Sequence, residues 1–74
     1  MKKTVDRTRR RILGARLRAY RTEQGLSQDK LGKMAGSDYN YIYELENGKK
    51  SPTVDMLCRL ADALGIQVRD LIVF

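Results

Sequence analysis

Glycines divide this 74-residue chain into short segments, and each segment carries apolar residues at helical spacing. The glycines that close such a segment are Gly25, Gly36, Gly48 and Gly65. A helix commonly ends at a residue with positive φ, a conformation that glycine adopts at little cost. The segments are therefore expected to be short helices, and the pattern predicts an all-α fold, one compact domain of five helices.

The expected helices begin at polar residues that can cap them, because Ser27, Asp38 and Thr53 each precede an apolar stripe. The expected ranges are about Thr8 to Gln24, Ser27 to Ala35, Asp38 to Asn47, Thr53 to Leu64, and a last short helix or turn within Ile66 to Ile72. Residues 1–8 carry no apolar period. They are expected to form a basic, flexible arm in front of a domain of residues 9–74.

The segment SDYNYIYELENGKK, residues 37–50, supports two interpretations. Its alternating tyrosines and the Asn-Gly pair that follows are typical of a β-hairpin. The second strand would then contain Pro52, which lacks the N–H that a strand ladder needs, among residues without apolar alternation. A helix capped by Asp38 would instead bury Ile42 and Leu45. The helical interpretation is therefore favoured.

Composition excludes several classes of function. The chain has no histidine and one cysteine, so no internal disulfide and no transition-metal site is expected. Cys58 lies within an apolar helical pattern and is expected to be a small core or boundary residue. No nucleophile with a base and no phosphate-binding loop is present, which argues against an enzyme and against a cofactor. No apolar run is long enough for a membrane span or a secretory signal, and a reducing cytoplasm fits best.

The charge of the chain is strongly basic and uneven. Fifteen Lys and Arg residues against nine Asp and Glu give a net charge of +6. The excess lies at the front, where Asp6 is the only acidic residue before Glu23. Such a field attracts polyanions, most often nucleic acid in a cytosolic protein. A solvated surface without a partner also explains the charge, so charge alone does not decide.

Four pieces of the sequence resemble the Cro and phage-repressor (Xre-type) family of helix-turn-helix DNA-binding domains. They are LGARLRAYR at 13–21, GLSQDKLGKMAG at 25–36, YIYELENGKKSPT at 41–53 and LCRLADALGI at 57–66. The resemblance implies a lambda-repressor-like fold whose second and third helices form the helix-turn-helix, with the third helix in the major groove. It also places Gly32 where these two helices cross, and it pairs Arg21 with Glu46 to tie the first helix to the third.

The resemblance further implies how DNA is contacted. The expected phosphate-contacting residues are Ser27, Gln28, Asp38, Asn47, Lys49 and Lys50, together with Arg10 and Arg11 of the basic N-terminal segment. The expected base-reading residues are Tyr39, Asn40, Tyr43 and Glu44. Asn40 suits adenine, Glu44 suits the amino group of cytosine, and tyrosine rings suit thymine methyl groups or phosphates.

The expected recognition face departs from the family pattern, because most relatives carry Gln, Ser, Thr, Arg or Lys there. Asp38, Glu44 and the tyrosines make this face acidic and aromatic. A second hypothesis therefore stays open, in which the tyrosine face binds another protein, as in an antitoxin-like or polymerase-bridging module.

The first hypothesis is a sequence-specific regulator of transcription, a repressor or controller protein, that binds double-stranded DNA at a palindromic operator. It is expected to act as a homodimer in the cytoplasm, without a small-molecule effector. The expected dimer interface consists of Leu71, Ile72, Val73 and Phe74, which are more apolar than a short exposed tail should be. The alternative is that these residues complete the core.

Overall fold

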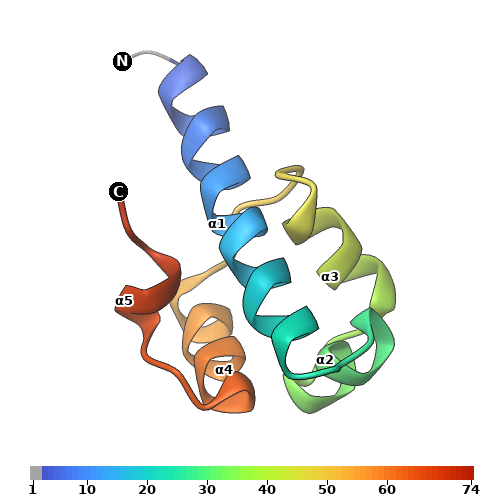
Figure 1. Ribbon diagram of the computed structural model, residues 1–74. Coiled ribbons are helices and arrows are strands. Elements are labelled where there is room, and N and C mark those ends of the chain that lie inside the picture. Colours follow the sequence, from blue (N-terminus) through green and yellow to red (C-terminus); the bar gives the residue numbers. More distant parts are fainter. Residues whose placement is uncertain (1–2) are drawn as a thin grey trace.

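The computed structural model describes residues 3–74, and this part of the chain forms five α-helices and no strand (Figure 1). The helices are α1 (Lys3–Glu23), α2 (Gln28–Met34), α3 (Tyr39–Glu46), α4 (Val54–Leu64) and α5 (Val68–Leu71). The predicted all-α fold is confirmed, and the hairpin interpretation of residues 37–50 is excluded because these residues contain α3. None of the described helices is both long and apolar enough to span a membrane.

Three helices begin at the predicted capping residues. The Ser27 side chain accepts a hydrogen bond from the Lys30 backbone N–H, and Asp38 accepts one from Tyr41 in the same way. The Thr53 hydroxyl accepts one from the Met56 N–H. Each cap satisfies a backbone donor that has no partner within its helix.

The first helix begins earlier than the sequence predicted. It starts at Lys3, whereas the apolar period indicated a start near Thr8. The period reports which residues pack against the core, and a helix can continue beyond that contact where no Gly or Pro stops it. Within the predicted arm, Met1 and Lys2 lie outside the described residues, and the flexibility of the arm stays a prediction.

The core draws one or more side chains from every helix. Its fully buried large residues are Leu17, Leu31, Ile42, Leu45, Leu60 and Leu71. Around this core, α1 packs between α3 on one side and α5 on the other, and α2 packs against α3 and α4 (Figure 1). The N-terminal turns of α1 extend past the rest of the domain (Figure 1).

Two predictions about α4 and α5 were wrong. Leu71, predicted at a dimer interface, is 0% exposed and belongs to the core of its own chain. Cys58, predicted as a core or boundary residue, is exposed. The buried face of α4 includes Met56 and Leu60, and Cys58 is two residues from each, about 200° around the helix. Cys58 therefore points to solvent.

Close backbone contacts hold α3 in place. A Cβ on Gly32 would lie 2.6 Å from the carbonyl carbon and oxygen of Asp38, so the predicted close approach at Gly32 is confirmed. A second close approach involves Gly14 of α1, where a Cβ would overlap the carbonyl oxygens of Leu45 and Glu46. Both ends of α3 are therefore fixed by a neighbouring glycine.

Candidate nucleic-acid interface

Helix α3 is buried along one face and exposed along another. Ile42 and Leu45 are fully buried in the core. The four predicted base-reading residues lie on the remaining surface: Tyr39, Asn40 and Tyr43 are exposed, and Glu44 is half-buried. The helix thus presents these side chains together on a scaffold that its buried face and its glycine contacts keep fixed.

The two exposed tyrosines of α3 stack on each other. The ring centres of Tyr39 and Tyr43 are 6.2 Å apart, and their planes differ by 25°. Lys49 Nζ lies 5.9 Å from the centre of the Tyr43 ring. Tyr39 and Tyr43 are about one helical turn apart, which makes the stacking of their rings possible.

Tyr41 points in a different direction, as the helical spacing requires. It is half-buried against the core, and Lys50 Nζ lies 5.4 Å from its ring centre. Lys50 also pairs with Glu44 at 3.3 Å, so the acidic residue of this face has a cationic partner. Burial raises the pKa of the Tyr41 phenol, against the opposing effect of the Lys50 and Arg59 charges.

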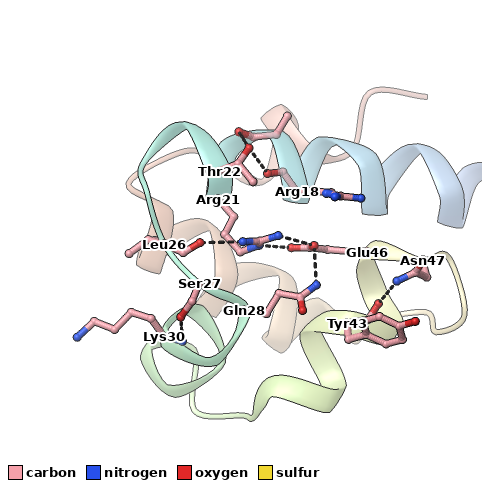
Figure 2. Close-up of polar contacts among 11 residues, drawn as sticks. Arg18, Arg21, Thr22, Leu26, Ser27, Gln28, Lys30, Tyr43, Glu46 and Asn47 are labelled. Carbon is pink, nitrogen blue, oxygen red and sulfur yellow. Dashed lines mark hydrogen bonds and ion pairs between the residues drawn. The ribbon is translucent and has the colours of Figure 1, made fainter.

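A buried polar cluster joins α1, α2 and α3 (Figure 2). Arg21 donates from Nε to Glu46 Oε2 at 2.6 Å and from Nη2 to Glu46 Oε1 at 2.9 Å, which confirms the predicted pair. Arg21 also donates to the Leu26 carbonyl oxygen at 2.8 Å, and Gln28 Nε2 donates to Glu46 Oε1 at 3.0 Å. The hydrogen bond to Glu46 raises the pKa of Arg21 more than burial lowers it, and the carboxylate charge adds to the rise.

Three of the predicted phosphate-contacting residues line a shallow groove, and Asp38 is not among them. The groove has a volume of about 560 Å³ and runs between α1, the start of α2 and α3. Its lining includes Ser27, Gln28 and Asn47, together with the two stacked tyrosines. Asn47, the C-cap residue of α3, donates from Nδ2 to the Tyr43 carbonyl oxygen at 2.8 Å (Figure 2). Its side chain thus binds a backbone carbonyl in the last turn of the helix.

The basic residues of α1 meet the loop that follows α3. Arg10 Nε donates to the Gly48 carbonyl oxygen at 3.3 Å. Gly48 has a φ of +71°, and Arg11 packs against it so closely that a Cβ there would lie 2.9 Å from the Arg11 Cγ. These arginines therefore stand beside the loop that carries Lys49 and Lys50.

One basic residue of this surface was not among the predicted phosphate-contacting residues. Arg18 is exposed and lines the same groove as the tyrosines and Gln28. Its position was available from the sequence, because Arg11 and Arg18 are seven residues apart and so share a face of α1. The same spacing applies to Gly14 and Arg21, which both contact the end of α3.

The predicted dimer residues differ in how far they are exposed to solvent. Ile72 is half-buried, whereas Val73 and Phe74 are about half exposed. The Arg9 guanidinium lies 5.8 Å from the centre of the Phe74 ring, so the C-terminal segment lies against α1. On α4, Val54 and Cys58 are exposed one turn apart.

Known proteins resemble this chain over most of its length. The helix-turn-helix family HTH_3 matches residues 17–71. The uncharacterized HTH-type transcriptional regulator y4dJ of Sinorhizobium fredii is 35% identical over 63 residues, which are 85% of this chain and 82% of the relative. The immunity repressor protein of Bacillus phage phi105 is 36% identical over 56 residues, 76% of this chain and 39% of that repressor.

A solved structure shows the same fold. The restriction-modification controller protein C.AhdI from Aeromonas hydrophila superposes with a TM-score of 0.82 at 37% sequence identity, over 84% of this chain and 94% of that protein. The matched region contains α2 and α3, the two helices that cross at Gly32. The chain therefore belongs to the Xre-type helix-turn-helix family of DNA-binding transcriptional regulators.

Proposed function

We propose that this protein regulates transcription by placing α3 in the major groove of double-stranded DNA at a specific sequence. The observation that carries the proposal is the arrangement of α3, whose side chains Tyr39, Asn40, Tyr43 and Glu44 lie together on the surface while its opposite face is buried. A recognition helix needs such a fixed backbone, because base contacts tolerate little displacement.

Two of these side chains suit particular bases. The Asn40 amide matches the N6 donor and N7 acceptor of adenine, and the Glu44 carboxylate matches the N4 donor of cytosine. Lys50 holds Glu44 at 3.3 Å, which offsets the negative charge that would otherwise face the phosphates. Glu44 and Lys50 are both partly exposed, so the pair can exchange partners when DNA binds.

Phosphate contacts are proposed on both sides of α3. Ser27, Gln28 and Asn47 line the groove beside the tyrosines. Lys49 and Lys50 lie in the loop after α3, and Arg10 and Arg11 lie beside that loop. Arg18 joins this set because it lines the same groove. For Asp38, only the backbone is proposed to contact a phosphate, because its carboxylate is negatively charged and caps α3. Such contacts fix the position of the protein on DNA without reading its sequence.

The proposed operator is palindromic, and the protein binds it as a homodimer. Two recognition helices would then read half-sites one turn of DNA apart, about 10 bp from centre to centre. The exposed Val73 and Phe74, with Ile72 and the outer face of α4, form the proposed interface, and the buried Leu71 is excluded from it. The proposed regulator acts in the cytoplasm without a small-molecule effector, so its occupancy of the promoter depends on its own concentration.

Selection of bound duplexes from a random library at about 150 mM salt tests the proposal, because purely electrostatic binding is already weak there. We expect an enriched inverted repeat. The Asn40→Ala protein is the matched variant, and it should lose preference at one base of each half-site. Enrichment of a single half-site would refute the homodimer, and the absence of any enriched sequence would refute sequence-specific binding.

One observation favours a second function. Tyr39 and Tyr43 form an exposed aromatic pair, and aromatic residues are enriched in protein interfaces. In that case the tyrosine face would bind a protein partner, as in an antitoxin-like or polymerase-bridging module. The double change Tyr43→Ala and Glu44→Ala separates the two functions: it should alter base preference if α3 reads DNA, and it should leave DNA binding intact if this face binds a protein.

A further inference from the structure

We infer that Tyr39 and Tyr43 together form the contact surface for the 5-methyl group of a pyrimidine in the major groove. This inference rests on the proposed function, and it names the chemical feature that this chain reads. Thymine and 5-methylcytosine both carry that methyl group at the same position of the base. The shared chemistry is therefore a 5-methylpyrimidine.

The geometry of the pair supports a joint surface. Tyr39 and Tyr43 are 48% and 43% exposed, although their rings stack at 6.2 Å. The rings contact each other, and each residue keeps exposed surface that can touch a base. Lys49 Nζ also lies 5.9 Å from the centre of the Tyr43 ring, so Tyr43 has two neighbours that restrict it, and Tyr39 is restricted through the stack. Two rings held this way lose little freedom on binding.

The chemistry of a phenol narrows what this surface can recognise. A tyrosine has one hydroxyl and cannot make the bidentate hydrogen bonds by which Asn, Gln or Arg identifies a purine. Most of its exposed area is an apolar ring. In the major groove, the thymine methyl group is the apolar feature of the standard bases, and apolar side chains recognise it by contact.

The residues next to the ring pair can form the hydrogen bonds to bases that the tyrosines cannot form. Asn40 follows Tyr39 in sequence, and Glu44 lies one turn after Asn40, so hydrogen-bonding side chains flank the ring pair on α3. The charge of Glu44 is offset by Lys50. The ring pair also lines the groove with Arg18 and Gln28, which are proposed phosphate contacts and would hold α3 at a fixed depth.

The test uses the full chain and the duplex found by library selection. Each thymine in a half-site is replaced by uracil, and in a second series each cytosine is replaced by 5-methylcytosine, with Kd measured by fluorescence anisotropy. If thymine is read, removal of one methyl group should weaken binding by about fourfold, the equivalent of one buried CH₂ group. If 5-methylcytosine is read, its introduction should strengthen binding by a similar factor at one position.

Variants assign the effect to the ring pair. Tyr39→Ala and Tyr43→Ala should abolish the difference between methylated and unmethylated bases, and circular dichroism checks that these exposed changes leave the fold intact. Tyr39→Phe and Tyr43→Phe should retain the difference, because the ring remains. Tyr20→Phe, outside α3 and outside the groove, is the matched control and should behave as wild type.

The outcomes separate this inference from the proposed function. If wild-type protein binds its site selectively but responds to no methyl group, the inference fails and the proposed function stands. A methyl effect that persists in both alanine variants also refutes it, as does a loss of affinity in the phenylalanine variants without a methyl effect, which would indicate hydroxyl contacts to phosphate. If wild-type protein prefers no duplex, the proposed function fails, and the inference fails with it.

Discussion

Arg21 and Glu46 form a two-point ion pair between α1 and the last residue of α3, with their closest atoms 2.6 Å apart. Both side chains are largely excluded from water, and Gln28 and the Leu26 carbonyl bind the same cluster. A pair in this position fixes the orientation of α3 relative to the helix that carries most of the basic residues. The buried pair thus links folding to the position of the proposed recognition helix.

We expect Glu46→Gln to destabilise the protein strongly, because Arg21 is 9% exposed and would keep its charge without a carboxylate. Loss of one partner of a buried ion pair costs about 3–5 kcal/mol. Urea denaturation measures the change. Glu44→Gln is the matched control, since its pair with Lys50 is partly exposed, and it should cost below about 1 kcal/mol. Equal effects of the two substitutions would contradict a structural role for the Arg21–Glu46 pair.

Gly32→Ala should be destabilising although alanine is the better helix former. The added Cβ would lie 2.6 Å from the Asp38 backbone, so α2 and α3 must separate. Overpacking of this kind costs about 1–3 kcal/mol, and the gain in helix propensity is at most about 1 kcal/mol. The close atoms belong to the backbone and cannot move aside as a flexible side chain can, so the cost should prevail. Thermal denaturation measures the net effect. Lys33→Ala, exposed on the same helix, should be nearly neutral; a stabilised Gly32→Ala protein would show that the helices do not meet there as described.

The basic face of α1 should contribute to the salt dependence of DNA binding. Arg7 and Arg11 are exposed one turn apart on α1. If each contacts a phosphate, Arg7→Gln or Arg11→Gln should reduce the slope of log K against log salt by about 0.9 for each bound protomer. Both arginines lie within α1, which begins at Lys3, so these substitutions leave the helix in place.

Arg69→Gln is the control for these arginines, because α5 lies on the other side of α1 from α3 (Figure 1). Its salt slope should equal that of wild type. An unchanged slope in both α1 variants would remove this segment from the DNA interface.

Val73→Asp should weaken self-association by about tenfold or more, because a charge placed in a dimer interface loses its hydration. Sedimentation equilibrium over a range of protein concentrations measures the dissociation constant. Met34→Asp tests specificity, since Met34 is a similarly exposed apolar residue on α2. Dissociation of both variants alike, or a wild-type protein that stays monomeric at high micromolar concentration, would contradict the proposed interface.

Tyr41 should make the protein less stable at high pH. Burial raises the pKa of Tyr41 above its ordinary value of 10.0, so the folded state keeps the phenol proton when the unfolded state has lost it. The free energy of unfolding should therefore decrease as pH rises from about 10 through the folded-state pKa. Tyr41→Phe removes this group, and urea denaturation between pH 9 and 11 should show a shallower decrease. If the free energy of unfolding decreased equally with pH in the wild-type and Tyr41→Phe proteins, a raised pKa of Tyr41 in the folded state would be contradicted.

Much of this fold was predictable because its signals are local. A capping side chain binds a backbone N–H within its own first turn, so Ser27, Asp38 and Thr53 mark helix starts without knowledge of the rest of the chain. Gly65 ends α4 with a φ of +68°, which is equally local. The apolar stripe of α3 likewise predicted the burial of Ile42 and Leu45.

Resemblance to a family added the long-range pair of Arg21 and Glu46, which periodicity does not predict. The further hydrogen bond of Gln28 to Glu46 and the place of Arg18 in the groove emerged from the packing of three helices. The mid-helix Gly14 carried the same signal as Gly32, a glycine where alanine would favour the helix. A close approach at Gly14 was predictable on that ground, whereas its partner, the end of α3, was known only from the structure.

The sequence by itself determined where α2, α3 and α4 lie and which face of α3 is polar, because those properties depend on residues within a few positions of one another. Only the tertiary structure decided that Leu71 is buried, that Cys58 is exposed and that α1 continues back to Lys3. Burial depends on which helices meet and at what angle. A four-residue helix such as α5 has too few positions to reveal this from its own pattern.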